Sequence, residues 1–358
     1  MLFGCTNVDM FLLEEQRRNP ALTGDFSMLF GDIVRSCKAI AHIVSQGALA
    51  KLPSHAASQD AQDETQRTLD ILSNQSFLKY CGWGGHFSAL SSGEMEDICP
   101  LPFAGQRSRY LLAFEPLDGA SNIDVNLTVG SIFSVLCCAD QGTEPSVADF
   151  LQPGSSQVAA GYAIYGPSTM LVLTVGTGTH GFTLDREIGD FLLTHPKLQI
   201  PASTHNFSIN TSNERFWESP IRRYVDECLA GKTGVREKDF NMRWAAAMVA
   251  DVHRILMRGG VFMYPRDARD LSKPGRLELI HRANPMAMLV EQAGGLASTG
   301  YERISEVLPA SLHEQVSVIL GSRDEVERID RYHQEYLSGE DKPFSSPLFA
   351  TRTLFHSN

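Results

Sequence analysis

Between about residues 110 and 185, the chain consists of short apolar runs separated by glycine-containing turns. This alternation constrains the fold most, because the runs are rich in β-branched and aromatic residues, which favour strands over helices. The runs are YLLAF, SIFSVLCC, VAAGYAIYG, TMLVLTVGTG and GFTLD. We therefore expect a sheet of several strands in this part of the chain.

Helical periodicity flanks this region. After Thr23, apolar residues recur at three-to-four-residue spacing from Phe26 to Ala41, which predicts an amphipathic helix capped by Thr23. The N-terminus of such a helix can bind an anion, although most capped helices bind nothing there. Residues 53–64 are expected to form a loop. A second helix is expected over 65–78, before the sheet. Beyond the sheet, helices and strands mix, which predicts a layered α/β fold. Helices are expected there over 220–230, 242–257, 284–293 and 325–337, and strands at GGVFMYP and SVILGS.

The length of 358 residues corresponds to about two domains. The stretch 197–205 is polar and contains a proline, which is typical of a domain boundary. We therefore expect an N-terminal domain over residues 1–200, a C-terminal domain over 201–338 and an irregular tail over 339–358.

The composition excludes several classes of protein. Hydrophobic residues make up 43% and charged residues 20% of the chain, so intrinsic disorder and fibrous structure are excluded. The net charge of -11 argues against nucleic acid as a partner. The longest strongly apolar stretch, TMLVLTV, is too short to span a membrane, and the N-terminus lacks the pattern of a signal peptide. Seven cysteines without a CxxC pair fit a reducing cytoplasm, so we expect a cytoplasmic protein.

Two carboxylates, Glu115 and Asp118, end the first apolar run of the sheet region, and a Gly119-Ala120-Ser121 turn follows at once. Carboxylates at a strand end supply the oxygen ligands that Mg²⁺ prefers, and the ion keeps positions for phosphate oxygens. The amides of the turn and the Ser121 hydroxyl can form a nest for phosphate. The alternative is an acidic β-turn, since Asp-Gly is common in hairpins.

Other charged residues can join this site. Upstream carboxylates include Glu94 and Asp70, which either converge on a metal-phosphate site or belong to a solvated surface. In the second half, three arginines stand near a tyrosine and an asparagine in the order that a phosphate clamp needs, although a single arginine is more typical of the surface; these residues are Asn210, Arg243, Tyr264, Arg276 and Arg282.

The block EPLDGASNIDVN resembles the Asp-Pro-Leu-Asp-Gly-Ser-Ser-Asn-Ile-Asp signature of class I fructose-1,6-bisphosphatases, a branch of the lithium-sensitive sugar and inositol phosphatases. Further segments follow in that family's order, so that the resemblance runs from about Thr23 to Leu337; they are VAAGYAIYGPSTMLVLTVGTGTHGFTLD, MVADVHRILMRGGVFMYP, NPMAMLVEQAGGLASTG and SVILGS. It implies a layered α/β/α/β/α sugar-phosphatase fold with two mixed-sheet domains. It also implies an allosteric, cytoplasmic homotetramer that uses Mg²⁺ to hydrolyse the 1-phosphate of D-fructose 1,6-bisphosphate, in gluconeogenesis or the Calvin cycle.

The resemblance also implies roles for individual residues. Glu94 is a metal-site and water-activating residue, and Asp70 is its acidic partner. The metal ligands correspond to Glu94, Glu115, Leu117 through its carbonyl, and Asp118. Residues that face the 1-phosphate correspond to Asp118, Gly119, Ala120 and Ser121. The residues that bind the sugar and the 6-phosphate correspond to Asn210, Tyr264, Arg276 and, from a neighbouring subunit, Arg243. The inhibitory AMP site corresponds to Thr23, Gly24, Asp25, Ser27, Arg109 and Tyr110.

Three departures from the family pattern fall on the metal site. Gly93 replaces the first of two paired glutamates, Glu115 replaces an aspartate, and Arg282 replaces a ligating glutamate. We therefore expect fewer metal ions, with Arg282 supplying positive charge to the substrate phosphate. The alternative is a catalytically weakened paralogue that binds sugar bisphosphate or AMP in a regulatory or hetero-oligomeric role. Sedoheptulose 1,7-bisphosphate remains a second candidate substrate, and an inositol-phosphate or nucleotide phosphatase is a third interpretation.

Overall fold

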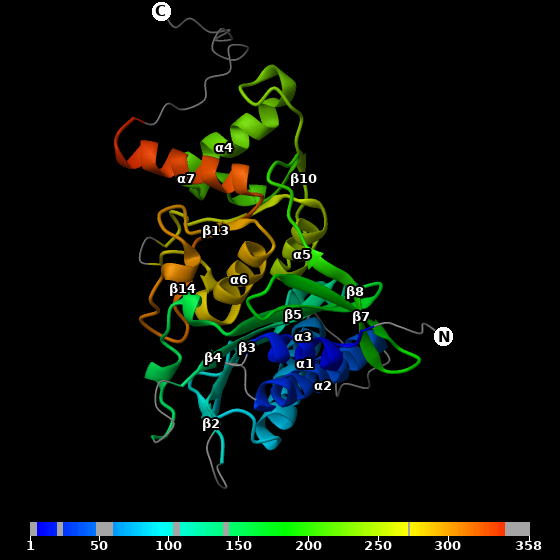
Figure 1. The fold of residues 1–358 in the computed structure, drawn as a ribbon. Coiled ribbons are helices and arrows are strands. Elements are labelled where there is room, and N and C mark those ends of the chain that lie inside the picture. The colour runs from blue at the N-terminus through cyan, green and yellow to red at the C-terminus, as the bar shows by residue number, and fades with distance from the viewer. Residues whose placement is uncertain are drawn as a thin grey trace, which may run out of the picture.

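The computed structural model describes residues 6–19, 24–47, 60–102, 108–138, 143–270 and 273–340 (Figure 1). Thr23, most of the predicted 53–64 loop and nearly all of the predicted tail lie outside these residues. Two sheets dominate the described part of the chain, and helices lie between them and on their outer faces.

The first sheet has eight strands in the order β2-β1-β3-β4-β5-β6-β7-β8. The β1–β3 pair is parallel and the other neighbouring pairs are antiparallel. Every residue of β3, β5 and β6 is buried, because layers of helices cover both faces of the sheet. The predicted strands between residues 110 and 185 are confirmed. The strands are β1 (Ala89–Ser92), β2 (Cys99–Pro100), β3 (Tyr110–Asp118), β4 (Val129–Cys137), β5 (Ala159–Tyr165), β6 (Thr169–Thr174), β7 (Thr179–Asp185) and β8 (Asp190–Leu198).

Three helices cover one face of this sheet: α1 (Val8–Arg18), α2 (Gly24–Gln46) and α3 (Asp60–Trp83). The apolar stripe of α2 packs on the sheet, with the ring of Phe30 6.1 Å from that of Phe133. Helix α1, whose N-terminus is capped by the side chain of Asn7, was not predicted from the sequence. The predicted loop over residues 53–64 is wrong at its end, because α3 already begins at Asp60 in a polar stretch without apolar periodicity.

The second sheet has five strands in the order β10-β9-β11-β15-β13, and a two-stranded ribbon, β12-β14, lies apart from it. Helix α5 begins six residues later than predicted, because Asn241 and Met242 pair with β9 and Trp244 stacks on Phe262. The strands are β9 (Asn206–Ser208), β10 (Asn241–Met242), β11 (Val261–Tyr264), β12 (Leu277–Glu278), β13 (Leu296–Ser298), β14 (Gln315–Val316) and β15 (Val318–Gly321). The helices are α4 (Ser219–Ala230), α5 (Met248–Arg258), α6 (Asn284–Gln292) and α7 (Arg323–Leu337).

Helices α5 and α6 form a layer between the two sheets. One apolar core joins Tyr162 of the first sheet, Val252 of α5, Met286 of α6 and Phe262 of the second sheet. Helices α4 and α7 cover the outer face of the second sheet (Figure 1). The layers are therefore α/β/α/β/α, as predicted. Among the described residues, no helix is both long and apolar enough to cross a bilayer.

Candidate active site

The parallel pairing of β1 and β3 brings two acidic segments to the same edge of the first sheet. Ser92 at the end of β1 lies beside Phe114 of β3, so Glu94, just after β1, lies near the last residues of β3, which include Glu115 and Asp118. Helix α3 packs over this edge, with Phe77 stacked on Phe114 at 4.5 Å. A cavity of about 480 Å³ opens at this edge, and Asp70, two turns before Phe77 on the same helix, lines it together with Glu94 and Glu115.

The turn after β3 requires glycine. Gly119 has φ of 80°, and a Cβ on it would lie 2.4 Å from the Cβ of Ala247. The close approach places Asp118 beneath the N-terminus of α5, where its Oδ2 accepts a hydrogen bond from the amide of Val249 at 2.9 Å. The dipole of α5 stabilises this buried carboxylate. The following residues form the short 3₁₀ helix η2 (Ala120–Asn122) at the cavity wall.

Arg282 lies among these carboxylates. It belongs to a π-helical turn, η7 (Leu279–Ala283), a kind of turn that is frequent at functional sites. Its guanidinium lies 3.1 Å from both oxygens of Glu115 and 3.1 Å from Oδ1 of Asp118. The Glu115 and Asp118 side chains are only 2% and 3% exposed. Arg282 therefore neutralises charge that two buried carboxylates share.

Two of the sequence departures are linked in space. A Cβ on Gly93 would lie 2.3 Å from Oε2 of Glu115. The longer side chain of Glu115 thus occupies space that a side chain at position 93 would need. The absence of a side chain at Gly93 and the extra methylene of Glu115 are one arrangement rather than two independent changes.

Two acids of the site have pKa values shifted towards neutrality. Burial and, to a smaller extent, the nearby Glu94 raise the pKa of Asp70 to about 6, against the lowering effect of Arg282. Burial raises the pKa of Glu115 to about 7, against the lowering effect of Arg282. Proton acceptors with a pKa near the working pH are suited to general base catalysis.

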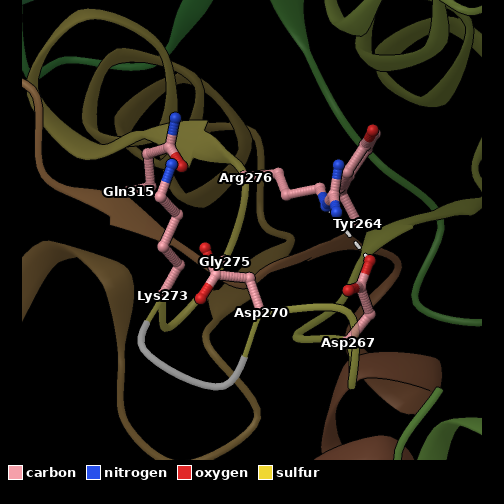
Figure 2. Close-up of a pocket in the computed structure, with 7 residues that line it drawn as sticks. All are labelled: Tyr264, Asp267, Asp270, Lys273, Gly275, Arg276 and Gln315. Carbon is pink, nitrogen blue, oxygen red and sulfur yellow. Dashed lines mark hydrogen bonds and ion pairs between the residues drawn. The ribbon is translucent and has the colours of Figure 1, made fainter. Parts of the chain in front are cut away.

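The other end of the cavity is formed by the second sheet and carries polar and basic groups. Asn210, Tyr264 and Arg276 line it, and Nε of Arg276 donates to Asp267 at 3.1 Å. Figure 2 shows the adjoining hollow of about 290 Å³, in which Arg276 and Tyr264 lie across from Lys273. This end is therefore suited to a polar, anionic ligand.

The structure brings most of the predicted catalytic, metal and substrate residues to one cavity: Asp70, Glu94, Glu115, Leu117, Asp118, Gly119, Ala120, Ser121, Asn210, Tyr264, Arg276 and Arg282. Arg243 is not among its lining residues and is exposed to solvent. Further lining residues were not predicted from the sequence. Gln66 lies one helical turn before Asp70, a spacing that would have indicated it, and Trp244 is one residue after Arg243.

The residues of the predicted AMP site lie away from this cavity. Gly24, Asp25 and Ser27 form the first turn of α2, while Thr23 is outside the described residues. Tyr110 is 1% exposed, with its ring 5.8 Å from Phe26 of α2, and the guanidinium of Arg109 lies 5.6 Å from the ring of Tyr110. The start of β3 and the start of α2 are therefore neighbours.

The layered fold and its acidic, arginine-containing cavity define a sugar phosphatase. Family models described as the N-terminal and C-terminal domains of fructose-1-6-bisphosphatase match residues 6–196 and 200–334. The chain belongs to the class 1 fructose-1,6-bisphosphatase family.

Two similar relatives are both named fructose-1,6-bisphosphatase class 1. The one from Hydrogenophilus thermoluteolus is 57% identical over 347 residues, 96% of each chain. The one from Methylacidiphilum infernorum is 54% identical over 347 residues, 97% of each chain. A crystal structure of Leishmania major fructose-1,6-bisphosphatase in holo form matches with a TM-score of 0.82 and 37% identity, covering 92% of this chain and 99% of that one.

Proposed function

We propose that this protein hydrolyses the 1-phosphate of D-fructose 1,6-bisphosphate, releasing fructose 6-phosphate and inorganic phosphate. The observation that carries the proposal is a single cavity with an acidic, proton-accepting end and a basic end. Asp70 and Glu94 lie at the first, and Arg276 and Tyr264 at the second. The names of the relatives support the same activity.

The residues of the chain divide the work between binding and proton transfer. The turn Gly119-Ala120-Ser121 cradles the 1-phosphate, and Arg276 with Asn210 holds the 6-phosphate and the sugar. Arg282 offsets the negative charge that develops on the phosphoryl oxygens. Asp70 and Glu94 activate the attacking water, and Asp70 takes its proton, because a carboxylate with a pKa of about 6 is mostly ionised at neutral pH and is more basic than an ordinary aspartate.

The donor set fits a divalent cation, and the family needs one. The carboxylates of Asp70 and Glu94 lie close enough to repel each other. Oε1 of Glu115 is buried and makes no hydrogen bond, although Nη2 of Arg282 lies 3.1 Å from it. We propose Mg²⁺, because hard oxygen ligands suit it; its ligands would be Glu94, Glu115, Asp118 and the carbonyl of Leu117. When bound, such an ion lowers the pKa of water and polarises the phosphoryl group.

The test is phosphate release from fructose 1,6-bisphosphate during a Mg²⁺ titration, with sedoheptulose 1,7-bisphosphate and an inositol phosphate as competing substrates. We expect fructose 1,6-bisphosphate to be hydrolysed. Asp70→Asn should reduce kcat by about 10²–10⁴-fold. Glu96→Gln removes an exposed carboxylate two residues from Glu94 and should change kcat less than about twofold. Preference for another substrate would contradict the assignment.

A second candidate function is a catalytically weakened regulatory paralogue that binds sugar bisphosphate or AMP. The contact of Arg282 with both Glu115 and Asp118 favours it, because these carboxylates are then shared with a guanidinium. Tight binding of fructose 1,6-bisphosphate without turnover would select this alternative. We expect Thr23→Ala to bind AMP more weakly than the unaltered chain in a calorimetric titration. Equal binding by the variant and the unaltered chain would contradict the proposed AMP site.

The exposed position of Arg243 supports a homotetramer in which this residue reaches a neighbouring subunit's site. Sedimentation of the purified chain tests the assembly. If Arg243→Ala raises KM in the tetramer without changing its mass, the proposed role in substrate binding is supported; an unchanged KM would exclude it.

A further inference from the structure

A second group of polar side chains lies next to the active site and takes no part in the proposed reaction. Nδ1 of His281 lies 2.7 Å from Oε2 of Glu278, and Nδ1 of His313 lies 3.1 Å from Oε1 of the same carboxylate. One nitrogen or oxygen atom of each residue lies within 4.8 Å of the others. His281 is fully buried, and His313 is 36% exposed.

The far nitrogen of each imidazole is held by a separate partner. Nε2 of His281 lies 2.9 Å from the hydroxyl of Ser91, and Nε2 of His313 lies 2.8 Å from the carbonyl oxygen of Met95. A carbonyl oxygen only accepts, so Nε2 of His313 carries a hydrogen. In the neutral ring, Nδ1 is then an acceptor that faces the carboxylate oxygen of Glu278. Two acceptors at 3.1 Å need a cation between them, either a proton or a metal ion.

We propose that Glu278, His281 and His313 bind one divalent transition-metal ion of the zinc type, with both imidazoles ligating through Nδ1. Two nitrogens and one carboxylate oxygen suit Zn²⁺, whereas Mg²⁺ prefers oxygen ligands alone. Bonds of about 2.0–2.1 Å in a tetrahedron place neighbouring ligand atoms about 3.3 Å apart. His281 faces Oε2 of Glu278 at 2.7 Å and His313 faces Oε1 at 3.1 Å, and one ligand atom of each residue lies within 4.8 Å of the others. Small side-chain rotations therefore bring two nitrogens and one carboxylate oxygen to these distances.

The outer contacts agree with such a site. Ligating histidines usually donate their other N–H to a carbonyl, a hydroxyl or a carboxylate, which fixes the ring, and Met95 and Ser91 provide those acceptors here. The exposed side of His313 leaves access for the ion and for a water as fourth ligand.

The ion would connect segments that carry active-site residues. Glu278 immediately precedes η7, and His281 belongs to this turn, next to Arg282. His313 contacts Met95, the residue after Glu94. Glu278 also lies near Gly93, whose added Cβ would be 3.3 Å from Oε2 of Glu278. The metal therefore clamps both walls of the acidic end of the cavity without contacting substrate.

Calorimetry with Zn²⁺ alone tests the proposal on the full-length protein after chelator treatment. Zn²⁺ also binds carboxylates of the active site, so stoichiometries are compared between variants. We expect His313→Gln to bind one equivalent less than the unaltered chain. His205→Gln, which changes an exposed histidine elsewhere, should keep the full stoichiometry. Glu94→Gln, which changes an active-site carboxylate, should still bind the equivalent of Zn²⁺ that His313→Gln loses.

A spectroscopic readout separates this site from oxygen-only binding. Co²⁺ in a tetrahedral site with nitrogen ligands gives intense visible absorption, which we expect in the unaltered chain and in Glu94→Gln but not in His313→Gln. Circular dichroism of His313→Gln establishes that it folds. Equal Zn²⁺ stoichiometry and equal Co²⁺ spectra in the folded His313→Gln variant and the unaltered chain would overturn the proposal and assign the contact to a protonated histidine. Neither readout depends on phosphatase activity.

Discussion

Arg282→Ala is the change that most directly tests how charge is balanced in the active site. It removes the guanidinium from Glu115 and Asp118, whose side chains are 2% and 3% exposed. Breaking a buried ion pair by removing one partner costs about 3–5 kcal/mol, because the other charge is left unpaired in a medium of low polarity. We expect a loss of that size in the free energy of unfolding, measured without metal.

A divalent cation should reverse part of this loss. With Arg282 gone, the guanidinium no longer competes with a cation for the two carboxylates, and Mg²⁺ at one hundred times its dissociation constant would stabilise the folded state by about 2.7 kcal/mol. The same Mg²⁺ concentration should stabilise the unaltered protein less, since Arg282 already neutralises these groups. Arg282→Ala therefore gains more stability from metal than its parent does.

Chemical denaturation with and without Mg²⁺ measures both effects. Arg276→Ala is the matched control, because it also removes a guanidinium from the cavity, but one that is 39% exposed. We expect it to lose about 1 kcal/mol or less and to respond to Mg²⁺ as the parent does. The reasoning is refuted if Arg282→Ala is as stable as Arg276→Ala without metal, or if Mg²⁺ stabilises both variants equally.

Two further predictions concern buried groups. Gly93→Ala should lower the free energy of unfolding by about 1–3 kcal/mol, because the added Cβ clashes with Glu115. Glu115→Asp should relieve this clash, so a double-mutant cycle should give a coupling energy above about 0.5 kcal/mol. Additive effects of the two substitutions would contradict the spatial link between Gly93 and Glu115. Burial and, to a smaller extent, His195 lower the pKa of His253 to about 4, so the unfolded chain binds the proton first as pH falls below about 6.5. Between pH 7.5 and 5.0, this should remove about 2 kcal/mol of stability, and His253→Gln, which retains an acceptor for Tyr162, should lose correspondingly less in denaturation at the two pH values.

The sequence predicted most helices and strands because these elements carry clear periodicity, whereas the order of the layers was implied by the family resemblance. Strands β3, β5 and β6 are buried along their whole length and consist largely of apolar residues, as expected for a sheet covered on both faces. The errors arose where local pattern is weak or is overridden. The first turn of α3, from Asp60, is polar, and residues 242–247 precede α5 because Trp244 packs on Phe262. Such tertiary contacts are not encoded in local spacing.

The candidate site was predictable where its residues are adjacent in sequence, as in the block from Glu115 to Ser121. The charge change at Arg282 was also visible, but its contacts with both carboxylates depend on the π-helical turn that carries it. The cluster around Glu278 was not predictable, because His313 is 35 residues away and no metal-binding spacing connects them. Convergence of distant segments requires the fold.

The helix layer between the two sheets has a consequence for how the protein unfolds. Val252 and Met286 belong to a core that includes residues of both sheets, such as Tyr162 and Phe262. Separating the chain near residue 200 would expose this apolar surface on each fragment, and exposed apolar surface promotes aggregation. Neither half is therefore expected to persist alone in water. The two sheets should therefore melt in one cooperative transition, although all strands of the first sheet precede residue 200 and all strands of the second follow it.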